Sequence, residues 1–185
     1  MVASTSLADR YWVWGGLLIG WAREGRVLPY DCRDADFAFD SADRRAFHEA
    51  ARALMDSGFD PLYRFINNHG DATEYSFMRN GAKFEFFECQ PVEGRMRYHV
   101  YGASDPGGQP TQGLAEVSAQ QLEVFSFIGR RWRKPRDHDL ALSESYGDWR
   151  RPDSSWNYMN DLAIRSRAAW RGTDYEWSGD LPPLG

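Results

Sequence analysis

A short acidic strand that follows a glycine pair constrains this chain most. Asp34 and Asp36 are separated by one residue, and the segment 35–39 is typical of a β-strand. Side chains alternate along a strand, so both carboxylates project from one face, roughly 6 to 7 Å apart. Two carboxylates at that spacing can share a hard cation such as Mg²⁺, which takes oxygen ligands. The Gly15-Gly16 turn precedes an apolar, helix-like run (17–22) and supplies backbone N–H groups where a phosphate could approach.

Length and composition favour a single domain spanning residues 1–185, or one domain with a small appendage. The net charge of −5 and the pI of about 5.4 argue against general nucleic-acid binding. No apolar run reaches the ~18 residues that a transmembrane helix needs. Cys32 and Cys89 are too few for a disulfide scaffold or a zinc site, so we expect a reducing, cytoplasmic location.

The remaining elements are predicted from periodicity and turn signals. A helix should begin after Asp40-Ser41 and end at Gly58, with His48 on its surface. Strands are expected over 11–14, 62–66, 73–79, 82–89, 96–101 and 122–128, and a helical stretch over 162–170. The loop 102–113 is a connection or a lid. The basic cluster 129–136 is a solvated face or a landing site for an anionic donor or acceptor.

The run from Gly15 to Asp36 resembles the signature of the LicD/fukutin-like family, which belongs to the nucleotidyltransferase-fold superfamily. The residues on that pattern are Gly15, Gly16, Leu17, Leu18, Gly20, Arg23, Pro29, Asp34 and Asp36. Gly16 stands where the family often has Thr or Ser. The acidic cluster 31–36 is also one residue longer, which leaves open whether Asp31 or Asp34 is the outer acid. The resemblance implies an α+β fold with a nucleotidyltransferase-type mixed β-sheet and helices packed on it.

Two later segments are similar to the same family. The strand 83–89 resembles the one that carries a third metal carboxylate, and Glu85 falls on that position. Glu88 would replace it if the register shifted, and an exposed glutamate on an edge strand is the alternative. The C-terminal signature is matched by Tyr146, Gly147, Asp148, Trp149 and Pro152. Tyr146 and Trp149 could stack on a base or ribose, or could wedge a loop against the core. The resemblance covers about 11–156 and leaves 157–185 as an extension.

The resemblance also implies a function. It suggests a Mg²⁺- or Mn²⁺-dependent transferase that moves phosphocholine, ribitol phosphate or glycerol phosphate from a CDP-activated donor to a sugar hydroxyl of a glycan. In that scheme Asp34 and Asp36 bind metal, and Glu85 completes the site or acts as the base. Gly15, Gly16, Arg23, Tyr146 and Trp149 contact substrate, with Arg23 on the donor phosphate.

Two rival functions come from different classes. One is nucleotidyl transfer to a small molecule on the same fold. The other is a non-catalytic nucleotide- or glycan-binding domain, which the altered spacing in 31–36 would favour.

Overall fold

A mixed sheet of eight strands forms the framework of the part of the chain that the structure describes. The computed structural model describes residues 2–103, 108–172 and 176–181. The sheet is organised around β5 (Ala82–Val92), its longest strand, which pairs in parallel with β2 (Asp34–Asp40). All other pairings are antiparallel. They add β1 (Tyr11–Val13), β3 (Asp60–Ile66), β4 (Ala72–Arg79), β6 (Arg95–Gly102), β7 (Thr111–Ser118) and β10 (Ile164–Ala169).

One face of the β2–β5 pair is covered by α2 (Arg44–Asp56). The buried residues of this helix recur every three or four positions, which is the pattern of a helix with one core face. Phe47 stacks on Phe39 of β2 with ring centroids 4.3 Å apart, and it also contacts Phe86 of β5. The core on this side of the sheet is therefore built from aromatic rings.

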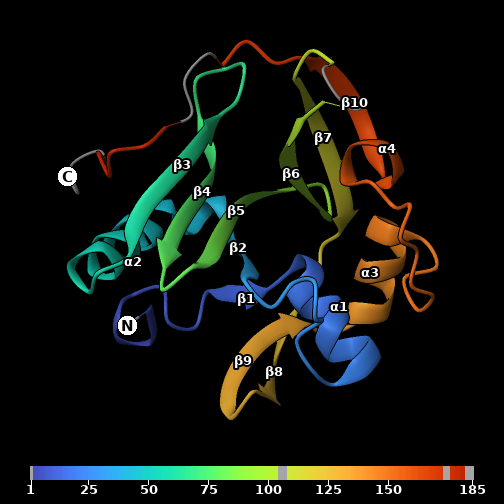
Figure 1. Cartoon of the computed structure of the whole chain (residues 1–185), viewed down its shortest axis with the longest axis horizontal. Helices are drawn as coiled ribbons and strands as arrows, with labels where there is room; N and C mark the ends of the chain where they lie inside the picture. Colours follow the sequence, from blue (N-terminus) through green and yellow to red (C-terminus); the bar gives the residue numbers. More distant parts are fainter. Residues whose placement is uncertain (1, 104–107, 173–175, 182–185) are drawn as a thin grey trace.

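The other helices lie away from α2 (Figure 1). The helix α1 (Gly15–Glu24) follows β1, and α3 (His138–Tyr146) follows the separate hairpin of β8 (Leu122–Phe127) and β9 (Arg130–Pro135). The hairpin joins the core through Trp132, which stacks on Phe37 of β2 at 5.7 Å. Shorter turns are η1 (Val2–Ser4), η2 (Ser41–Asp43) and α4 (Tyr158–Asp161). No helix within the described ranges is long and apolar enough to cross a membrane.

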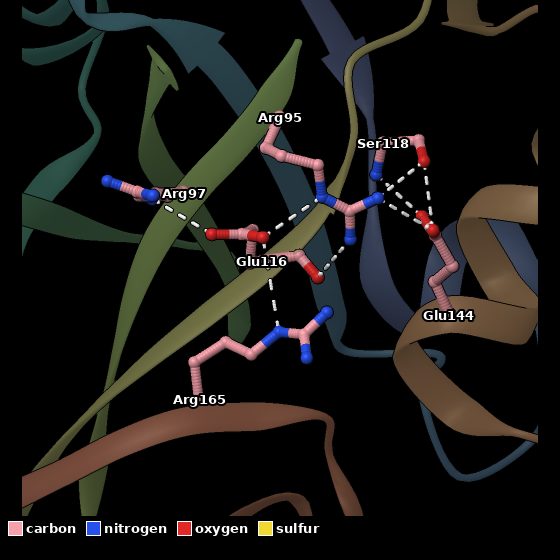
Figure 2. Close-up of polar contacts among 6 residues, drawn as sticks. All are labelled: Arg95, Arg97, Glu116, Ser118, Glu144 and Arg165. Carbon is pink, nitrogen blue, oxygen red and sulfur yellow. Dashed lines mark hydrogen bonds and ion pairs between the residues drawn. The ribbon is translucent and has the colours of Figure 1, made fainter. Parts of the chain in front are cut away.

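A polar network fastens α3 to the sheet, as Figure 2 shows. The Glu144 carboxylate on α3 accepts hydrogen bonds from Arg95 of β6 and from Ser118 of β7, each at 2.9 Å. Arg95 also donates to Glu116 of β7 at 3.0 Å, and Arg97 and Arg165 approach the same carboxylate. The bonds to Glu144 join strands to a helix, so they fix α3 and therefore Tyr146 at its C-terminal end.

The expected fold class is confirmed, since the structure is a mixed α+β arrangement with helices packed on a large mixed sheet. Two local expectations are wrong. Residues 164–169 form the strand β10 on the open edge of β7, because strand pairing there overrides helix propensity. His48 is buried, with its ring against Phe47 and Tyr75. The basic cluster 129–136 supplies β9 of the hairpin, with Arg130, Arg131 and Arg136 exposed, and the structure does not decide between the two roles expected for it. Part of the predicted loop 102–113, residues 104–107, lies outside the described residues.

Candidate metal and donor site

Three carboxylates meet on the face of the β2–β5 pair that carries Asp34 and Asp36. In the parallel register Asp36 lies opposite Glu85 and Asp34 lies opposite Lys83. Because side chains alternate with a period of two, Asp34, Asp36 and Glu85 share that face. One oxygen from each carboxylate lies within 4.8 Å of one from each of the others. We call these three residues the acid cluster.

The acid cluster has the properties of a site for a divalent cation. Its donors are all carboxylate oxygens, the ligands that Mg²⁺ and Mn²⁺ favour. Asp34 Oδ1 is buried and has no hydrogen-bond partner among the described residues, although buried polar atoms are normally paired. A cation bound to the cluster would satisfy this oxygen and would offset the repulsion among the three carboxylates. The residues present therefore fit a metal ion.

The glycine pair brings the start of α1 against the acids. The Gly16 N–H donates a hydrogen bond to Asp36 Oδ2 at 3.1 Å, so this group positions Asp36 and does not lie open to a ligand. Gly15 has a φ of +51°, and a Cβ there would lie 2.1 Å from the same Oδ2. A Cβ on Gly16 would lie 2.3 Å from Asp31 Oδ2. Residues without a Cβ thus let two carboxylates reach the helix N-terminus, where the helix dipole favours negative charge.

Burial and mutual repulsion dominate the electrostatics of the acids. Burial raises the pKa of Asp36 well above its usual range, and the charges of Glu85 and Asp34 raise it further. Burial and the charge of Glu85 also raise the pKa of Asp34. Asp31 lies beside the cluster but outside the 4.8 Å group, and its pKa is raised by burial and by Asp34. The geometry thus favours Asp34 over Asp31 as the outer acid.

Three further residues lie at the site but were not predicted to belong to it. Lys83 Nζ lies 2.7 Å from Glu85 Oε2 and 3.1 Å from Asp34 Oδ2. The Tyr63 hydroxyl of β3 donates to Glu85 Oε1. Glu74 of β4 is buried, and burial followed by the charge of Glu85 raises its pKa well above its usual range.

The Asn80-Gly81 turn could have located Glu74. Both turn residues have positive φ, as a two-residue hairpin turn requires. That turn pairs Arg79 with Ala82 and therefore sets Ser76 opposite Glu85 and Glu74 opposite Phe87. Counting back from the turn would thus have placed Glu74 and Ser76 on the face that carries Glu85.

The predicted substrate residues Arg23, Tyr146 and Trp149 come together beside the acids. Arg23 donates to the Trp149 carbonyl oxygen at 3.3 Å and to the Tyr30 hydroxyl at 2.8 Å. Burial raises the pKa of the Tyr146 hydroxyl, and the charges of Tyr98, Asp36 and Asp31 add to that effect. Trp149 is buried, so its ring packs in the core and offers no open stacking face here. Within the described residues, Arg23 Nε and Trp149 Nε1 are buried donors without a partner.

Glu88 lies away from the acid cluster. It is on the opposite face of β5 and accepts two hydrogen bonds from Arg44, at 2.6 and 2.7 Å. Glu88 is therefore the ion-pair partner of α2, and Glu85 keeps the position predicted for the third acid.

Cys32 and Cys89 lie far apart. Cys32 precedes β2, whereas Cys89 pairs with Asp40 at the other end of that strand.

Comparison with known proteins gives one positive result. The family model described as "LicD/FKTN/FKRP, nucleotidyltransferase domain" matches residues 8–105. The match includes the glycine pair, β2 and β5, and hence the whole acid cluster, and it ends before Tyr146. Among curated proteins no significant match is found.

Proposed function

Because this chain belongs to the LicD/FKTN/FKRP nucleotidyltransferase-domain family, we propose that it is a metal-dependent transferase acting on a CDP-activated donor. The group transferred is phosphocholine or an alditol phosphate such as ribitol or glycerol phosphate, and the acceptor is a sugar hydroxyl of a glycan. The observation that carries this proposal is the convergence of Asp34, Asp36 and Glu85 on one face beside the start of α1.

Each residue has a role in this proposal. Asp34 and Asp36 hold the metal ion, Mg²⁺ or Mn²⁺, which when bound neutralises charge on the diphosphate and on the leaving nucleotide. Glu85 completes the metal site or accepts the proton of the acceptor hydroxyl. Arg23 binds a donor phosphate through its guanidinium, which lies beside Tyr30 and Trp149. Gly15 and Gly16 shape the approach to the acids, and Tyr146 borders the donor. Trp149 acts through its carbonyl oxygen, which holds Arg23.

A second candidate is nucleotidyl transfer to a small molecule, which the description of the matched domain as a nucleotidyltransferase domain favours. Both reactions need a nucleotide phosphate and a metal ion, but they break different bonds. The proposed reaction cleaves a CDP-alcohol and releases CMP. The second candidate cleaves a nucleoside triphosphate and releases pyrophosphate.

The test is a product assay on the full chain. The protein is incubated with Mg²⁺ and CDP-ribitol, CDP-glycerol, CDP-choline or CTP, with a pool of mono- and oligosaccharide acceptors. We expect release of CMP from one CDP-alcohol, and loss of that release in Asp36→Asn. Release of pyrophosphate from CTP, without CMP from any CDP-alcohol, would establish the second candidate.

A further inference from the structure

The Lys83 ammonium forms a complete set of contacts within the acid cluster. It lies 2.7 Å from Glu85 Oε2, 3.1 Å from Asp34 Oδ2 and 3.3 Å from the Tyr63 hydroxyl. An ammonium group has three N–H donors and no acceptor, so these three oxygens account for all of its hydrogen-bonding capacity. Two of the three are oxygens of acid-cluster carboxylates, the groups that would hold a metal ion.

The choice of lysine fits this place. The chain contains only two lysines against twenty arginines. A guanidinium is a wide planar fork, whereas an ammonium is a compact point charge on a flexible four-carbon stem. Lysine is thus the cationic side chain that most resembles a small bound cation in size and charge distribution.

Lys83 also lies at the open side of the cluster. Its side chain is 27% exposed, whereas that of Glu85 beneath it is 8% exposed. The ammonium can therefore move outward into solvent without unpacking the core. The carboxylates of Asp36 and Glu85, in contrast, are held by the Gly16 N–H and by Tyr63.

We propose that Lys83 occupies the cation position of the metal-free acid cluster and, when a divalent ion binds there, moves out to bind a phosphate oxygen of the nucleotide donor. The second half of this statement rests on the proposed function. The exchange follows from electrostatics: a divalent ion takes the carboxylate oxygens that Lys83 uses and repels the ammonium. The displaced ammonium then lies beside the ion with no anion of its own, in the place where a metal-bound diphosphate brings negative charge.

The first test measures binding to full-length protein by calorimetry, with Mn²⁺ alone and then with CDP at saturating Mn²⁺. For Lys83→Met we expect Mn²⁺ to bind at least tenfold more tightly, because no ammonium competes, and CDP to bind at least tenfold more weakly. These opposite shifts separate the proposal from a structural role, which would weaken both. Lys134→Met is the matched control: it removes the only other lysine, whose ion pair is with Glu123, and both affinities should stay within twofold. Lys83→Gln replaces Lys83→Met if the latter does not fold.

The second test uses wild-type protein only. Lysine acetylation by an N-hydroxysuccinimide ester is followed by mass spectrometry, with the buried Lys134 as the reference for a lysine that stays protected under all conditions. Lys83 should react slowly without metal, faster with Mg²⁺, and slowly again with Mg²⁺ and CDP together.

The outcomes of the two tests separate the two proposals. Wild-type protein that binds no Mn²⁺ would overturn the proposed function and this inference together. Wild-type protein that binds Mn²⁺ and CDP, with unchanged or weaker Mn²⁺ binding in Lys83→Met and no effect of Mg²⁺ on Lys83 acetylation, would overturn this inference alone. Tighter Mn²⁺ binding with unchanged CDP affinity would overturn the phosphate role.

Discussion

Asp36 is the acid whose position depends on the most neighbours. It accepts the Gly16 N–H, its carboxylate fills the space that a Cβ on Gly15 would need, and it pairs in register with Glu85. Asp31 also touches the glycine pair but is not part of the acid cluster. The acids are therefore expected to differ in how much each contributes to activity.

The first prediction compares three Asp→Asn variants at positions 31, 34 and 36. Asn has nearly the volume of Asp, so each variant should fold while losing one negative charge. We expect Asp36→Asn to lower turnover by about 10²-fold or more, comparable to the loss of a preorganised electrostatic group. Asp34→Asn should also be severe, and Asp31→Asn should be mild. Initial rates of CMP release give the measurement, and near-full activity in folded Asp36→Asn would refute the mechanism.

The second prediction concerns His48, whose burial has a consequence for pH dependence. Its pKa is lowered by burial and by the charges of Arg52, Arg44 and Arg64. The folded state therefore keeps His48 neutral at pH values where the unfolded chain, with an ordinary pKa of about 6.5, binds a proton. This contribution to stability is present above pH 6.5 and is lost as pH falls through the lower, folded-state value.

The comparison is between wild type and His48→Gln. From pH 7.5 to 5.5 the melting temperature of wild type should fall more than that of the variant, at constant ionic strength. His69→Gln, at an exposed position in the β3–β4 turn, serves as the control and should follow wild type. A His48→Gln curve parallel to wild type would show that the pKa of His48 is the same in the folded and unfolded states, and the prediction would be wrong.

At the scale of elements, α1 has a glycine with positive φ at each end. Gly15 has a φ of +51° and Gly25 a φ of +66°, but only a Cβ at position 15 meets a neighbour, Asp36. The left-handed conformation costs a residue with a Cβ about 1 kcal/mol at either position. The third prediction is that Gly15→Ala and Gly25→Ala lose similar stability from this strain, while only Gly15→Ala also displaces Asp36.

Mn²⁺ affinity distinguishes the two glycine variants. It should fall at least tenfold in Gly15→Ala and stay within twofold of wild type in Gly25→Ala, as measured by calorimetry. Equal affinities in both variants would mean that the start of α1 does not position Asp36.

Local sequence patterns predicted some elements and missed others for identifiable reasons. The strands around Asp36 and Glu85 have clear alternation and good turn signals, so their faces could be predicted. α3 is short, and its residues carry almost no amphipathic pattern, so it was missed. β10 depends on the open edge of β7, a partner about fifty residues earlier that no local pattern reveals. Glu85 was expected from a family pattern. The contact of Lys83 with Asp34 required the β2–β5 register, and that of Tyr63 with Glu85 required the arrangement of β3, β4 and β5.

At the scale of the whole molecule, the acid cluster lies on the two strands that connect most of the sheet. β5 pairs with β2, β4 and β6, and β2 pairs with β1. Repulsion among the carboxylates therefore opposes the pairing of β2 with β5 at the centre of the sheet. A ligand that relieves the repulsion should stabilise the fold as a whole.

The last prediction is a global response to metal. A ligand that binds only the folded state stabilises it by RT ln(1 + [L]/Kd), which is about 1.4 kcal/mol at ten times Kd. For a chain of this size that corresponds to a rise of roughly 3 to 6 °C in melting temperature. We expect Mg²⁺ or Mn²⁺ to produce such a rise, CDP to increase it further, and EDTA to reverse it. Asp36→Asn should show little or none of the shift, because it lacks a ligand charge but keeps the fold. An equal rise in Asp36→Asn would mean that the ions act elsewhere on the surface, and the metal assignment of the acid cluster would then be wrong.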